Sequence, residues 1–210
     1  RAAEPPMLTN AAILLTVLGL ALALRPWRLL AGATRLGPLL ATLVILPWLW
    51  ALPVLHAMPL QLQWSGACLA VLLLGWPLAV PVLCGVGAAA WLIAPLSPAE
   101  ALDLTVWLGL VPATLALLLG AAIRRFVGTH PFVYLLGRAF LGSVACIFAA
   151  GVLAQWTGHT LPGVSTELSL VARWLMAWGD AFVTGMLVAI FVAFRPQWVA
   201  TWSDPLYLHR

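Results

Sequence analysis

The side chains best placed to do chemistry lie on one face of the last long apolar run of the sequence. Asp180 lies near the middle of that run, and Arg173 lies two helical turns before it. Ser169 and Thr184 continue the same stripe at helical spacing. An ionisable group inside an apolar span costs roughly 3 kcal/mol on insertion scales, so it usually faces a partner or a cavity. We therefore expect this stripe to point into a helix bundle.

The role of Asp180 has two interpretations. Its carboxylate either lines a substrate site or path, or forms a buried structural pair with Arg173 or with Arg138. Arg138 lies part-way along a neighbouring apolar run. From that depth its long side chain either reaches back to the membrane surface or pairs with Asp180.

Further polar side chains stand near the ends of other apolar runs. Gln61 and Gln63 lie beside Ser65 at the start of a short run. Amides at a broken helix either contact a ligand or face the membrane interface. Asp103 lies at the start of another run, where the helix dipole stabilises an acid, and it is also a candidate wall of a substrate cavity.

The histidines lie near the ends of apolar runs or in the segments between them, and no two of them are spaced i, i+4. A haem ligated by two histidines between helices is therefore not expected. His56 and His159 are the candidate ligands for a metal ion, because imidazole suits transition metals.

The composition places these residues in a membrane. Of the 210 residues, 64% are hydrophobic and 8% are charged, whereas soluble domains carry roughly 25% charged residues. The apolar runs are long and unbroken, which favours helices over the two-residue alternation of a barrel. We predict an all-α, polytopic transmembrane helical bundle of about six or seven membrane segments, forming a single integral membrane domain over residues 1–210.

The residue types also exclude several functions. All ten basic residues are arginines, so the chain has no phosphate-loop lysine for ATP hydrolysis and no lysine for a retinal Schiff base. Ser65 has no histidine at its depth to activate it as a protease nucleophile. No basic tract interleaves with aromatic residues, so nucleic-acid binding is not expected. We expect no enzymatic activity and identify no resident cofactor.

Hydropathy predicts helices over residues 8–24, 36–52, 60–74, 78–93, 101–123, 131–156 and 168–194. The third rises about 22 Å, which is short of a hydrocarbon core of about 30 Å. The third and fourth segments are therefore either full spans or a re-entrant pair.

The arginines predict the orientation of these spans. If the connection after the first span lies inside, all the arginines that flank spans fall inside too: Arg25, Arg28, Arg35, Arg124, Arg125, Arg195 and Arg210. The opposite loops hold Glu100, Glu167, His56 and His159. Because basic residues accumulate on the cytoplasmic side, we expect an outside N-terminus and a cytoplasmic C-terminus.

The C-terminal part of the chain resembles a family of bacterial inner-membrane proteins. Residues 180–186 read DAFVTGM and residues 194–198 read FRPQW. This end is similar to that of the energy-coupling factor transporter permease family, which is distantly similar to cobalt- and nickel-uptake membrane components. Residues 132–134 (FVY), 139–142 (AFLG) and 75–79 (GWPLA) match further family motifs in order along most of the chain.

The resemblance implies particular site residues. In the metal-uptake relatives, a histidine three residues before a glycine of the third segment binds the metal together with the N-terminal residues. Gly66 matches that glycine, and Gln63 stands at the position of the histidine. Asp180 matches the acid of the family. The substrate cavity implied is bounded by Gln63, Asp180 and Asp103, with Thr184 beside them.

The resemblance implies a multi-pass protein of the bacterial inner membrane that captures a substrate for import, with a transition-metal ion as the inherited substrate. Its partners would be ATPase subunits and a second membrane permease subunit. The alternative is a non-catalytic accessory subunit docked onto a larger membrane complex, because faces rich in tryptophan and small residues suit packing against neighbouring helices.

Overall fold

The chain folds into a bundle of helices. The computed structural model describes residues 5–30, 33–56, 63–159, 161, 164–165 and 167–207. Its α-helices are α1 (Pro5–Ala23), α2 (Leu36–Leu55), α3 (Ala67–Leu74), α4 (Trp76–Ile93), α5 (Pro98–Leu104), α6 (Val111–Phe126), α7 (Gly142–Trp156), α8 (Ser169–Phe194) and α9 (Asp204–Tyr207). Short 3-10 helices are η1 (Pro26–Leu30), η2 (Ala33–Arg35) and η5 (Pro196–Trp198), and π-helical turns are η3 (Thr105–Leu110) and η4 (Val133–Leu141). No strand occurs within these ranges, so the all-α prediction is confirmed.

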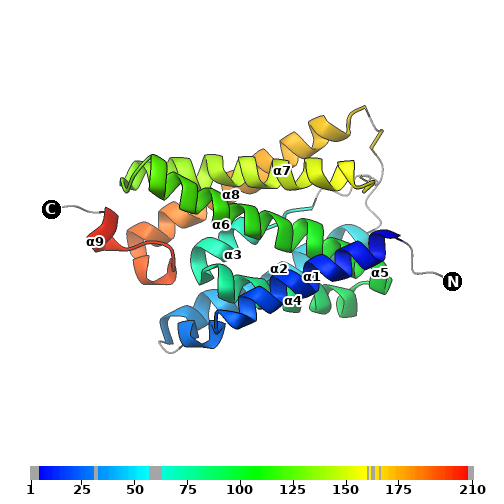
Figure 1. Cartoon of the computed structure of the whole chain (residues 1–210), viewed down its shortest axis with the longest axis horizontal. Helices are drawn as coiled ribbons and strands as arrows, with labels where there is room; N and C mark the ends of the chain where they lie inside the picture. The colour runs from blue at the N-terminus through cyan, green and yellow to red at the C-terminus, as the bar shows by residue number, and fades with distance from the viewer. Residues whose placement is uncertain are drawn as a thin grey trace.

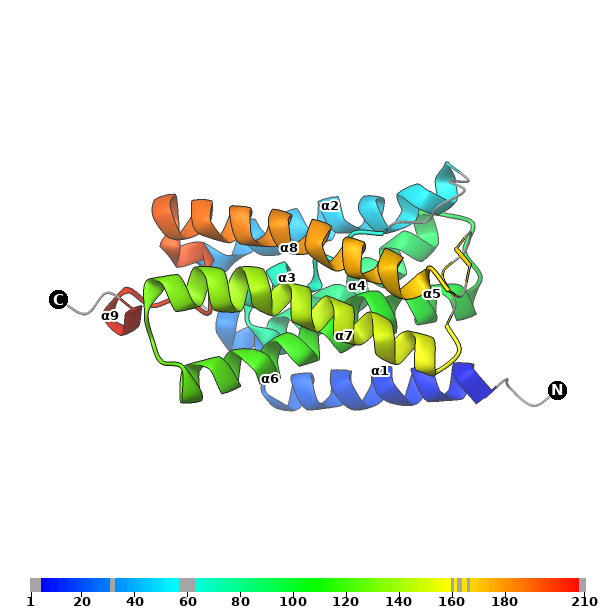
Figure 2. The same ribbon diagram turned by 90° about the horizontal axis from the view of Figure 1, so that it is seen from above.

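Within the described residues, five helical stretches are long and apolar enough to cross a membrane: Leu36–Leu55, Trp76–Ile93, Pro98–Phe126, Val133–Trp156 and Ser169–Phe194. A shorter apolar helix covers Met7–Ala23. The long helices run back and forth along one axis, and the two termini lie at opposite ends of the bundle (Figures 1 and 2). We refer to these as the N-terminal end and the C-terminal end of the bundle.

The prediction of a helix over 60–74 is wrong in its first half. Helix α3 is confined to Ala67–Leu74, and residues 63–66 before it are not helical. Residues 60–62 lie outside the described residues. Helix α4 is long and apolar enough to cross a membrane, whereas α3 has only eight residues. The helix starts late because the backbone at Ser65 and Gly66 hydrogen-bonds to α8.

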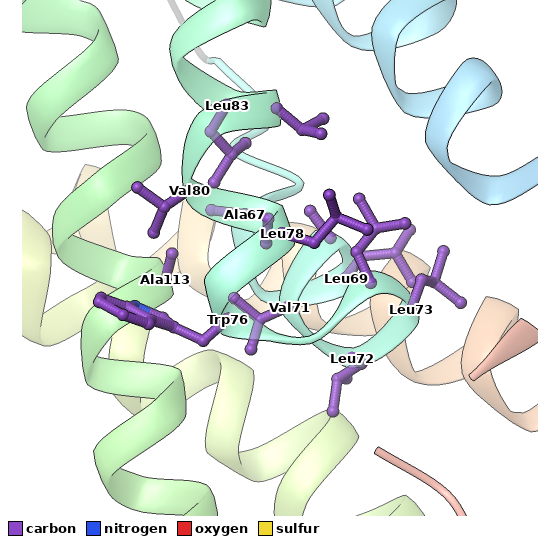
Figure 3. Packing of buried hydrophobic residues seen from close by; sticks show 14 of the residues in the cluster. Ala67, Leu69, Val71, Leu72, Leu73, Trp76, Leu78, Val80, Leu83 and Ala113 are labelled. Carbon is purple, nitrogen blue, oxygen red and sulfur yellow. The ribbon is translucent and has the colours of Figure 1, made fainter. Parts of the chain in front are cut away.

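Helix α3 lies at the centre of the bundle. Every one of its residues is buried, and it packs against α2, α4, α6, α7 and α8. Figure 3 shows leucine and valine side chains leaving α3 in several directions, with Trp76 and Val80 of α4 and Ala113 of α6 packed nearby. A helix that is apolar on all sides is stable only when surrounded by other apolar elements. The neighbouring helices therefore hold this short helix in place.

The C-terminal segment closes the far end of α3. The backbone N–H of Ala200 donates to the Leu73 carbonyl at 3.1 Å, and that of Thr201 donates to the Leu72 carbonyl at 3.2 Å. The Thr201 hydroxyl also donates to the Leu72 carbonyl, and it lies 2.6 Å from the Tyr134 hydroxyl. The last carbonyls of a helix have no partner within it. Two of them are satisfied here by residues far along the chain.

Candidate functional site

The candidate site is the break between the non-helical residues 63–66 and α3. The backbone N–H groups of Ser65 and Gly66 both donate to Oδ2 of Asp180, at 2.7 Å and 3.1 Å. The Thr184 hydroxyl donates to Oδ1 of Asp180 at 3.1 Å. Asp180 lies near the middle of α8 and is only 2% exposed. Both of its oxygens are therefore engaged by groups of the same chain.

This arrangement places a carboxylate from a distant helix at the start of α3, bonded to the N–H groups of the two residues that precede the helix. The first N–H groups of a helix have no partner within it, and the partial positive charge there favours an anion. Gly66 precedes α3 with φ 64, in the left-handed region that glycine adopts most easily. Its backbone thus turns toward the carboxylate. Asp180 supplies both the acceptor and the negative charge that this helix start requires.

Ser65 joins three other elements at the same point. Its hydroxyl donates to the Leu108 carbonyl at 2.5 Å and accepts from the Ala67 N–H at 3.2 Å. Its carbonyl accepts from the indole N–H of Trp50 at 3.1 Å. Leu108 lies in the π-helical turn η3, which precedes Pro112. The Ser65 hydroxyl therefore ties the break before α3 to this turn.

The predicted structural pairing of Asp180 with an arginine is wrong among the described residues. Arg173 instead donates from Nη2 to the His159 carbonyl at 2.7 Å. The Arg138 guanidinium lies 5.8 Å from the centre of the Tyr134 ring and packs beside Gly120. Both arginines lie in other neighbourhoods because the break before α3, which hydropathy does not reveal, occupies the space around Asp180.

The other members of the predicted stripe are bonded separately. Ser169 donates to Oε1 of Gln155 at 3.1 Å, which joins α8 to α7. Thr184 is the only predicted stripe residue whose side chain reaches Asp180 within the described part of the chain. The stripe therefore faces the bundle as expected, but it is not one continuous polar network.

A second polar cluster lies at the N-terminal end of the bundle. Asp103 Oδ1 lies 2.6 Å from His159 Nε2 and accepts from the Asn10 side-chain amide at 2.9 Å. The Trp107 indole donates to Asn10 at 3.2 Å, and its ring centre lies 5.0 Å from that of His159. Together with the Arg173 bond to the His159 carbonyl, this cluster ties α1, the α5–η3 stretch and α8 together.

The interpretation of Asp103 as a helix-start acid is wrong. That role belongs to Ser97 and Glu100, which form a reciprocal capping box at the start of α5. Asp103 lies further along the helix, where it contacts α1 and His159. Sequence reasoning also missed Asn10, although an amide within an apolar run was a signal that could have indicated it.

The remaining candidates contribute less to either cluster. Gln63 is half-buried just before the break, and Gln61 lies outside the described residues. His56 is exposed, with its ring 3.2 Å from the Leu52 carbonyl, and so does not join His159. In the described ranges, no group of three or more histidine, cysteine or acidic side chains is arranged to hold a metal ion.

Comparisons of the chain with protein-family models, with curated proteins and with solved structures gave no match.

Proposed function

We propose that this chain is the substrate-capturing membrane component of an energy-coupling factor type importer, with a transition-metal ion as its substrate. Partner ATPase subunits would hydrolyse ATP and act through a second membrane permease subunit. The observation that carries this proposal is the late start of α3, where the backbone of the two preceding residues bonds to the buried carboxylate of Asp180. Transporters commonly bind substrate or coupling ions where a spanning helix is interrupted near the membrane midplane.

The distribution of charge supports an orientation with the C-terminal end in the cytoplasm of a bacterial cell. η2, which ends at Arg35, packs against η5, which follows Arg195. Arg124 and Arg125 lie in the last turn of α6. Glu100 and Asp103 lie on α5, near the N-terminal end of the bundle (Figure 2). Basic residues gather on the cytoplasmic side of membrane proteins.

A cation that reaches Asp180 must compete with the backbone of residues 63–66. Oδ2 accepts both N–H groups of the break, so coordination by a metal ion weakens or replaces these bonds. Residues 63–66 then lose their hydrogen bonds to α8, and the surface that the bundle offers to a partner subunit changes. Gln63, just before the break, and Asp103 on α5 would offer oxygen ligands to an entering ion. A ligand shifts a conformational equilibrium only through such differential contacts.

Metal uptake by Asp180→Asn tests this proposal. Asparagine keeps the size of the side chain and one oxygen for the Ser65 and Gly66 N–H groups, but removes the charge. Uptake of radioactive Co²⁺ or Ni²⁺ by cells that carry the complete transporter should fall to background, with normal amounts of folded protein in the membrane. Asp204→Asn is the matched control, because Asp204 bonds Trp202 at the C-terminal end. Undiminished uptake by Asp180→Asn would refute the proposal.

The hydrogen bonds of Asp180 also favour a second function. The donors to Asp180 described above all belong to the same chain. This is expected if Asp180 only stabilises the fold of a non-transporting accessory subunit of a larger membrane complex. Affinity purification in mild detergent, followed by mass spectrometry, separates the two. Co-purification of an ATPase pair and a permease supports the importer, whereas stoichiometric subunits of another complex without an ATPase support the accessory role.

A further inference from the structure

A lateral cavity of about 310 Å³ lies between α2, α3 and α8. Its α2 wall runs from Gly37 to Leu46, and its opposite wall includes Leu187 and Phe191 of α8. Ala41 and Ile45 in the α2 wall are exposed, so the cavity opens on the side of the bundle. It extends from the level of the break before α3 toward the C-terminal end.

The cavity suits an apolar occupant. Its lining is apolar apart from Thr42 and Trp64. The Thr42 hydroxyl already donates to the Pro38 carbonyl at 2.8 Å. A polar or charged ligand would lose its hydration there without gaining matching hydrogen bonds. The occupant must therefore be hydrocarbon over the length of the cavity.

The dimensions distinguish a lipid chain from a partner helix. The α2 wall from Gly37 to Leu46 is about 13 Å long at 1.5 Å per residue, and one leaflet of hydrocarbon is about 15 Å deep. A helix is about 10 Å across with its side chains, so a partner helix would cover the open side of this cavity without filling it. A single acyl chain is narrow enough to enter, and its length matches the leaflet.

Two arginines flank the end of the cavity that faces the cytoplasm in the proposed orientation. Arg35 lies two residues before Gly37, and Arg195 follows α8 and is exposed. The two ends meet here, because the Trp198 ring lies against Gly37 and η2 packs on η5. Arginine near the membrane surface attracts anionic headgroups, and tryptophan favours the same depth. The mouth therefore has the charge that a phosphate headgroup requires.

We propose that this cavity binds one acyl chain of an anionic phospholipid of the cytoplasmic leaflet, with the headgroup phosphate held between Arg35 and Arg195. The proposal uses the membrane orientation given above and does not depend on transport. A lipid in this position fills the gap between α2 and α8 beside α3, and so supports the helix whose N-terminus Asp180 caps.

Native mass spectrometry of the detergent-purified chain tests the headgroup contact. The probe is palmitoyl-oleoyl phosphatidylglycerol, compared with the phosphatidylcholine of the same acyl chains. We expect the first bound lipid to favour phosphatidylglycerol, and the variant Arg35→Gln/Arg195→Gln to lose roughly five-fold in that preference for each arginine. Arg124→Gln/Arg125→Gln makes the same charge change on α6 and should leave the preference intact. Equal losses in the two double variants would overturn the proposal, because they would reflect general surface charge.

A second variant tests the chain-binding part. Ala41→Phe places a ring in the open cavity without displacing a buried neighbour, since Ala41 is exposed. It should reduce first-site binding of both lipids several-fold, whereas Leu118→Phe on the exposed face of α6 should not. Unchanged binding of both lipids by Ala41→Phe would show that the cavity is not the site.

Discussion

Asp180 accepts hydrogen bonds from residues that precede it by more than half of the length of the chain. Its carboxylate caps the N–H groups of Ser65 and Gly66, at sequence separations of 115 and 114 residues. A buried donor that loses its acceptor costs about 1–3 kcal/mol, because no water replaces the bond. The carboxylate of Asp180 therefore stabilises the fold at the break before α3.

Replacement of Asp180 should separate the need for an acceptor from the need for a charge. Asp180→Leu leaves two buried N–H groups without an acceptor and should lower the free energy of unfolding by about 2 kcal/mol or more. Asp180→Asn keeps one oxygen and should lose less. Equilibrium unfolding in mixed micelles, followed by circular dichroism, measures both. Equal stability of the leucine variant and the wild type would show that the cap contributes nothing.

The contact between Asp103 and His159 should contribute much less. The Asp103 side chain is 40% exposed and that of His159 is 17% exposed, and exposed ion pairs typically contribute about 0–1 kcal/mol. A double-mutant cycle with Asp103→Asn and His159→Gln should give a coupling energy in that range, and it should decrease at high salt. A coupling energy well above it would mean that water is excluded from the cluster at the N-terminal end.

At the scale of elements, α3 is a short helix whose two ends are satisfied by other parts of the chain. Gly66 and Gly75 bound it with φ values of 64° and 80°. Asp180 caps one end, and the segment around Thr201 caps the other. A helix this short is marginal by itself, because nucleation is costly and few bonds follow it. Its position is therefore fixed by tertiary contacts and not by its own helix propensity.

Gly66→Ala should destabilise this element. A Cβ at Gly66 would lie 2.8 Å from Cδ1 of Leu46, and the left-handed backbone disfavours any side chain. We expect a loss of about 1–3 kcal/mol in the free energy of unfolding. Gly19→Ala is the control, because a Cβ there has nothing within 4 Å and its helix should be unaffected or slightly stabilised. Similar stability of both variants would contradict the tight packing at the break.

At the scale of the whole molecule, the distribution of charge defines two ends. Arginines flank the C-terminal end of the bundle, whereas Glu100, Asp103 and His159 belong to the N-terminal end. The surface between them exposes large apolar side chains, among them Leu15, Ile45 and Phe182. We expect such a band to face lipid and each end to face one aqueous phase.

Labelling of introduced cysteines tests this orientation. The native Cys68 and Cys146 are buried and Cys84 is partly buried, so background labelling should be low. Glu167→Cys should react with a membrane-impermeant maleimide in intact cells, because Glu167 is exposed just before α8. Arg125→Cys should react only after the cells are permeabilised. The reverse pattern would invert the topology and move the proposed lipid site to the opposite leaflet.

The helical class and the positions of most long helices could be predicted from the order of the residues alone. Helices predicted at 36–52, 78–93 and 168–194 are observed at Leu36–Leu55, Trp76–Ile93 and Ser169–Phe194, because hydropathy over consecutive residues is a local property. The sequence also indicated that Asp180 points into the bundle. Three features became visible only once the chain was folded: α3 begins at Ala67, Ser65 and Gly66 rather than an arginine contact Asp180, and His159 contacts Asp103. Each of these depends on hydrogen bonds between distant segments, whose pairing follows from how the helices pack and not from the residues on either side.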